Sequence, residues 1–103
     1  MRHFYRSHLP PADVMASADA FFATLGLQVV ASAARRRVFQ GVVGTPEIPA
    51  RLALSVRPEG GHYTFVEVET DQMGESRLDR NVKKFFVQLR RQDDPRHALE
   101  AAY

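Results

Sequence analysis

Apolar and polar side chains change their spacing along the chain, and each change marks a predicted element. Residues 2–9 (RHFYRSHL) alternate between aromatic and polar side chains, which predicts a strand that ends at Pro10 and Pro11. From Pro11 to Gly26 the apolar residues recur every three or four positions, which is typical of a helix with one buried face. The residues expected on that face are Val14, Ala18, Phe21, Phe22 and Leu25.

A two-residue period begins at Leu27 and predicts a strand up to Ala34, after which the chain turns and continues as a further strand through RRRVFQGVV. Residues 50–57 (ARLALSVR) alternate cleanly, with Leu52, Leu54 and Val56 on one side. The segment PEGG has the residues of a turn, and HYTFVEVETD after it has the pattern of a returning strand. Residues 50–71 are therefore a predicted hairpin.

The last long segment, residues 74–92, is predicted to be a helix with a narrow apolar stripe, and residues 94–103 a short C-terminal helix. The stripe consists of Leu78, Val82, Phe85, Phe86 and Leu89. The element order is thus β-α-β-β-β-β-α. Antiparallel hairpins and two helices that each need an apolar surface predict an α+β fold, in which a curved, mainly antiparallel five-stranded sheet carries two helices on one face.

Length and composition agree with one globular domain over residues 1–103. Hydrophobic residues make up 45% of the 103 and charged residues 25%, which are ordinary values for a folded domain with a single core. The sequence has no cysteine, which excludes disulfides, thiolate metal ligands and a cysteine nucleophile. Because we find no signal peptide and no apolar run that would span a bilayer, we expect a cytoplasmic protein without membrane association.

Three consecutive arginines, Arg35 to Arg37, precede the apolar run VFQGVV. They suggest either a phosphate-binding patch or the solvated edge of a strand. Neighbouring side chains on a strand point to opposite faces, so three in a row do not form one patch there. We therefore expect Arg35 and Arg36 in a turn and Arg37 on the face of the sheet that the helices leave open.

Large side chains on that open face are the main candidates for a binding site. The predicted apolar contacts are Phe39, Tyr63 and Phe65. The residues expected to orient an acidic group are Arg37, Arg51 and Arg57. Because an exposed aromatic patch usually marks an interface or a ligand site, we expect a non-enzymatic module that forms a homodimer or binds an apolar small molecule.

The outer side of the second helix indicates an alternative class, a nucleic-acid-associated protein. A basic ridge there, interrupted by Val87, could follow a phosphate backbone. The ridge consists of Arg77, Arg80, Lys84 and Arg91. The pI of about 9.4 agrees with this reading, but the net charge is only +2 and acidic and basic residues are interspersed. A solvated helix face explains the ridge equally, and Asp79 and Lys83 at i, i+4 are typical of such a face.

Catalysis and metal binding have less support. Glu67 and Glu69 share a face of the last strand, where paired carboxylates serve either acid–base chemistry or ion pairs with the arginines of the preceding strand. His3 and His8 are predicted on opposite faces of one strand, where they would not bind the same ion. We therefore assign no catalytic residue, no metal site and no cofactor.

Four segments resemble pieces of the START and polyketide-cyclase superfamily, the helix-grip proteins: PPADVMASADAFFATLGLQVV, RRVFQGVVG, SVRPEGGHYTFVEVE and SRLDRNVKKFFVQLRR. The element order also resembles a single repeat of the TATA-box-binding-protein fold. The first resemblance implies a ligand cavity, although helix-grip proteins have additional elements that enclose it and this chain is shorter. The second implies that a lone repeat pairs with another copy.

Overall fold

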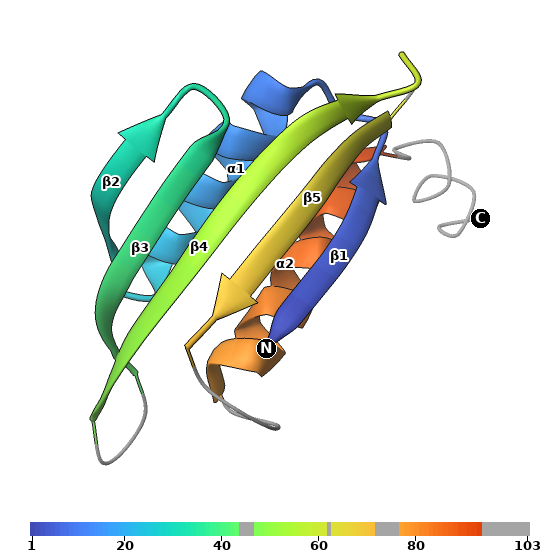
Figure 1. Ribbon diagram of the computed structural model, residues 1–103. Helices are drawn as coiled ribbons and strands as arrows, with labels where there is room; N and C mark the ends of the chain where they lie inside the picture. The colour runs from blue at the N-terminus through green and yellow to red at the C-terminus, as the bar shows by residue number, and fades with distance from the viewer. Residues whose placement is uncertain (44–46, 62, 72–76, 94–103) are drawn as a thin grey trace, which may run out of the picture.

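The computed structural model describes residues 1–43, 47–61, 63–71 and 77–93, which form an antiparallel sheet of five strands and two helices. The elements in chain order are β1 (Arg2–Ser7), α1 (Pro11–Thr24), β2 (Gln28–Ala33), β3 (Arg36–Val43), β4 (Ile48–Glu59), β5 (Tyr63–Thr70) and α2 (Arg77–Asp93). The strands lie side by side in the order β1-β5-β4-β3-β2 (Figure 1). The predicted fold class and element order are confirmed, and the expected helix over 94–103 lies outside the described residues.

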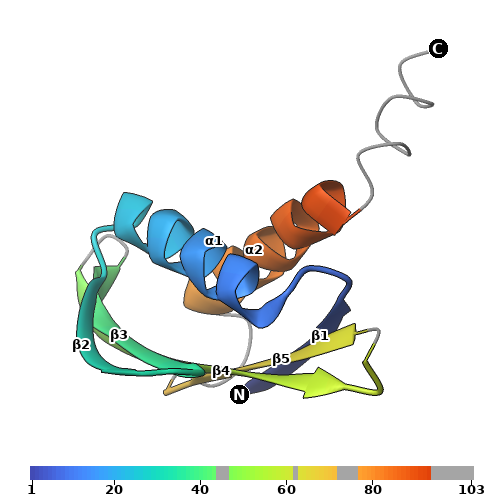
Figure 2. The same ribbon diagram turned by 90° about the horizontal axis from the view of Figure 1, so that it is seen from above.

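Both helices cover the concave face of the curved sheet and leave its convex face open (Figure 2). Helix α1 begins at Pro11, where a missing N–H costs nothing, and Asp13 in its first turn complements the helix dipole. The chain leaves α1 through Gly26, whose φ of +80° favours glycine. Neither helix in the described part of the chain is long and apolar enough to cross a membrane.

The core lies between the helices and the concave face. The fully buried side chains that the helical and strand periods predicted are Val14, Ala18, Phe22, Leu52, Leu54, Leu78, Val82, Phe85 and Leu89, and Val66 and Val68 of β5 join them. Phe21, Leu25 and Phe86, which were predicted on the same helix faces, are partly buried. The Phe22 ring joins the layers, because its centroid lies 5.1 Å from that of Phe39 on β3 and 5.2 Å from that of Phe85 on α2.

The structure corrects the expected positions of Phe39 and Arg37. Phe39 pairs with Leu52 on the concave side and is only 1% exposed. Arg37 pairs with Leu54 on the same side, and its Nε lies 3.3 Å from Oδ1 of Asp19 on α1. Placing both residues on the open face was therefore wrong.

The cause of this error is the position of the turn before β3. The turn consists of Ala34 and Arg35 instead of Arg35 and Arg36, so β3 begins at Arg36 and the pairing of β2 with β3 is shifted by one residue. A shift of one residue moves every side chain of a strand to the other face. The three arginines are consequently separated: Arg35 lies in the turn, Arg36 on the open face and Arg37 beside α1.

Two truncations test this register. We expect Phe39→Ala to lower the free energy of unfolding by about 3–5 kcal/mol, because it removes a buried ring and leaves a cavity. Phe65→Ala, on the open face, is the matched control and is expected to cost less than about 1.5 kcal/mol. Urea unfolding followed by circular dichroism measures both, and a larger loss for the Phe65 variant would contradict the register.

Candidate functional site

The open face carries an aromatic ridge, which we define as Phe4, Tyr63 and Phe65. Phe4 and Tyr63 are 55% and 43% exposed, and the ring centroids of Phe4 and Phe65 lie 5.5 Å apart. Tyr63 also contacts the His8 ring, at 4.8 Å between centroids. The structure thus places Tyr63 and Phe65 where the sequence predicted them, and it adds Phe4 from the neighbouring edge strand.

Two arginines flank Phe65 in one row across the sheet. Arg6 is opposite Phe65 on β1, and Arg57 is opposite it on β4. The Arg57 guanidinium carbon lies 4.5 Å from the Phe65 ring centroid, which is a cation–π contact. Arg6 reaches Glu59 instead, at 3.2 Å between Nη2 and Oε1.

The acidic residues of β5 are not paired with β4 arginines as the alternative interpretation expected. The register sets Glu67 opposite Ser55 and Glu69 opposite Ala53. Glu69 instead lies near β1, with its Oε2 3.8 Å from the Arg2 Nε.

The expected arginines Arg51 and Arg57 do lie on the open face, together with Arg36. Arg51 lies on β4 next to Leu52, which pairs with the last residue of β5, Thr70. The backbone N–H of Arg51 donates to Oδ1 of Asp71 at 3.1 Å.

A trough of about 110 Å³ runs beside the aromatic ridge. It is lined by Arg36, Ala53, Ser55, Glu67 and Glu69. The short side chains of Ala53 and Ser55 form its floor, and two carboxylates against one guanidinium give it a net negative charge. A second, more open hollow of about 460 Å³ is lined by Phe4, Tyr5, Arg6 and Phe65, so two residues of the ridge themselves border it.

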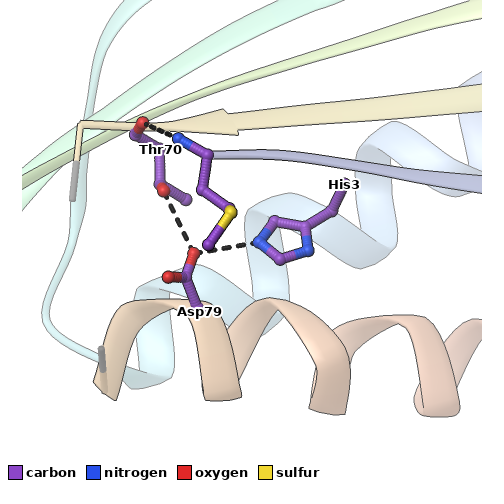
Figure 3. Close-up of polar contacts among 4 residues, drawn as sticks. His3, Thr70 and Asp79 are labelled. Atoms are coloured by element: carbon purple, nitrogen blue, oxygen red, sulfur yellow. Dashed lines mark hydrogen bonds and ion pairs between the residues drawn. The ribbon is translucent and has the colours of Figure 1, made fainter. Parts of the chain in front are cut away.

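The concave side contains a buried polar cluster of His3, Thr70 and Asp79 (Figure 3). Asp79, in the first turn of α2, is only 2% exposed. Its Oδ1 accepts from Nε2 of His3 at 2.9 Å and from the Thr70 hydroxyl at 3.1 Å. Asp79 is therefore not the solvated residue that its spacing from Lys83 indicated, and its carboxylate ties β1, β5 and α2 together.

An imidazole held by a carboxylate is also the arrangement that orients a general base. The His3 side chain is 14% exposed, so it is partly accessible. The trough and the second hollow on the open face are lined by other residues, and they do not bring a reacting group to His3. The cluster explains how α2 is fixed to the sheet edge, and we assign it no reaction.

A second carboxylate fixes the other end of α2. Asp93 Oδ2 accepts from the Tyr5 hydroxyl at 2.8 Å, and its Oδ1 accepts from the Ser7 hydroxyl at 2.7 Å. The backbone N–H groups of His8 and Leu9 donate to the same Oδ1. Burial and the neighbouring Asp93 carboxylate raise the pKa of Tyr5 to about 12.

Nothing in the described residues gathers the ligands of a metal ion, because they contain no group of three histidine or acidic side chains arranged to hold one. The side chain of Glu69 is 56% exposed, so its carboxylate is open to solvent. The open face instead has the chemistry of a contact surface, with exposed rings, guanidinium groups and carboxylates side by side.

Comparisons with known proteins bear on the fold. No family model and no curated protein sequence matches the chain. Among solved structures, the di-domain ARO/CYC protein StfQ from the steffimycin biosynthetic pathway is similar, with a TM-score of 0.55 at 12% sequence identity. The similarity covers 93% of this chain and 46% of StfQ, so the chain spans about half the length of that protein.

Two further structures are similar over most of the chain. A Deinococcus radiodurans protein is 12% identical over 89% of this chain and 95% of its own, with a TM-score of 0.42. A Thermus thermophilus protein is 14% identical over 90% and 87%, with a TM-score of 0.36. The StfQ likeness supports a helix-grip-like fold, and the TATA-box-binding resemblance stays a prediction.

The Tyr5–Asp93 contact predicts a loss of stability in alkali. Tyr5 has the ordinary pKa of 10.0 in the unfolded chain and a pKa of about 12 in the folded chain. Its contribution to the stability of the fold is therefore fully present below pH 10. That stabilisation is lost as the pH rises from 10.0 to about 12. We expect urea unfolding to show a smaller alkaline loss for Tyr5→Phe, which has no proton to release, while Tyr63→Phe keeps the wild-type pH dependence. Equal losses in Tyr5→Phe and wild type would exclude this role of Tyr5.

Proposed function

We propose that the protein is a non-enzymatic, cytoplasmic binding module whose working surface is the open face of the sheet, and that a second copy of the chain occupies this face. The observation that carries the proposal is the aromatic ridge: Phe4 and Tyr63 are about half exposed beside Phe65. Folded domains seldom leave contiguous rings in water without a partner.

Charge complementarity favours a second copy as that partner. The ridge has Arg6 and Arg57 on either side of Phe65, whereas the trough next to it is lined by Glu67 and Glu69. In a two-fold symmetric dimer the same surface meets itself, so it must offer both a projection and a matching depression. If the ridge of each copy lies in the trough of the other, arginines meet carboxylates at two symmetry-related contacts.

The size of the face also agrees with a dimer. Its strands contain 6 to 12 residues, and at about 3.3 Å per residue and about 4.8 Å between strands the sheet measures on the order of 600 Å² in projection. Because side chains project from the sheet, the accessible area of the open face is larger than this projected area. A standard interface buries about 800 Å² on each partner, so the dimer would use most of the open face.

Charge reversals test the pairing of ridge and trough. Arg57→Glu or Glu67→Arg alone sets like charges opposite each other, and we expect each to raise the dimer dissociation constant at least about tenfold. An equal mixture of the two variants restores opposite charges at both symmetry-related contacts. Sedimentation equilibrium measures the dissociation constants, and native mass spectrometry identifies the restored heterodimer by its mass.

The control is Arg35→Glu, which makes the same charge change in the turn before β3 and is expected to leave the dimer intact. A wild-type protein that stays monomeric at every concentration would refute the dimer. If the protein is a monomer that retains a small apolar molecule, this molecule occupies the open face in place of a second copy. A dimer that neither reversal weakens would show that the interface lies elsewhere.

A further inference from the structure

The outer face of α2 is a cationic ridge, which we define as Arg77, Arg80, Lys84 and Arg91. All four side chains are exposed, and within the described residues none forms an ion pair. At 1.5 Å per residue they extend over about 21 Å along one side of the helix. The sequence predicted these residues on a common face, and the burial of the opposite stripe confirms that arrangement.

The acidic residues of α2 do not offset this charge. Asp79 faces inward to His3 and Thr70, and Asp93 is bound by Tyr5 and Ser7 at the other end of the helix. The two carboxylates that fix α2 to the sheet are therefore withdrawn from its outer surface. Among the described residues of α2, a linear row of positive charge remains that no acidic side chain of the helix offsets.

We propose that this ridge binds the phosphate backbone of double-stranded nucleic acid without reading its sequence. A duplex carries one negative charge per about 1.7 Å of its axis, so a straight cationic row of this length lies along several phosphates. Arginine and lysine are the side chains that make such backbone contacts.

Other polyanions fit this surface less well. The only large apolar side chain exposed on α2 is Val87, which is too little for the apolar centre of a protein interface or for insertion into a lipid surface. The described outer face of α2 has no exposed aromatic ring, whereas single strands are bound by stacking their bases on such rings.

The neighbouring surface of α1 is formed by short side chains, which let a broad duplex approach: Ala12, Ala16, Ala20 and Ala23. Asp13 is the exposed acid there that opposes it.

The ridge and the dimer interface lie on opposite sides of the molecule, because both helices cover one face of the sheet (Figure 2). Duplex binding therefore does not depend on the proposed dimer. A dimer formed through the open faces would direct its two ridges outward in opposite directions and would bridge two duplexes. A monomer would bind one.

Fluorescence anisotropy with a labelled DNA duplex of about 24 base pairs tests the proposal over a range of salt concentrations. Four phosphate contacts predict a slope of log Kobs against log salt near −3.6, or about a 100-fold weakening between 50 and 200 mM salt. The double variant Arg80→Gln/Lys84→Gln removes two contacts and is expected to make the slope less steep by about 1.8.

The matched control is Arg35→Gln/Arg51→Gln, which removes the same charge from the β2–β3 turn and the open face and is expected to keep the wild-type slope. No binding at low salt would overturn the proposal, and so would equal losses in both double variants. Equal binding to poly-glutamate, to a single strand or to anionic vesicles would also overturn it, because each shows attraction to charge alone or to another class of partner. Repeating the titration with Arg57→Glu separates this result from the dimer: binding by a monomeric variant supports the ridge even where the dimer proposal fails.

Discussion

Burial of Phe39 against the helices is the constraint on which the rest of the structure depends. Its ring contacts Phe22, which in turn contacts Phe85, so one aromatic cluster joins the sheet to both helices. Because strand side chains alternate, a buried Phe39 fixes the register of β3 and sends Arg36 to the convex face. The pairings of β4 and β5 then bring Phe65, Arg57 and the carboxylates together on that face.

Periodicity was sufficient for the elements, the fold class and the buried stripes, because these depend on local spacing. It did not determine which face of β3 meets the helices, since Val38 and Phe39 are both apolar and both buried, and only Phe39 packs against α1. Phe4 was missed although it has a large ring next to Tyr5, and in a strand one of two adjacent rings must face outward. Asp79 resembled a solvated residue because its partner His3 lies at the other end of the chain.

The acidic side chains of α2 face the sheet, whereas its basic side chains face the solvent. Asp79 and Asp93 accept hydrogen bonds from β1, β5 and the segment after β1, and they hold the helix in place over the sheet edge. A buried carboxylate with several donors is well stabilised, whereas either one without its donors would be costly. The same arrangement keeps both acidic side chains of α2 away from its cations, so the attachment of the helix also determines the charge of its outer surface.

The measurement that tests this account most directly is a series of ¹H–¹⁵N correlation spectra of the labelled protein recorded during dilution. If the open face is the surface of self-association, amide shifts change with concentration around Phe4, Ser55, Phe65 and Glu67, and the amides of α1 and α2 keep constant shifts. Concentration-dependent shifts confined to the helices, or spectra that do not change on dilution, would contradict the account.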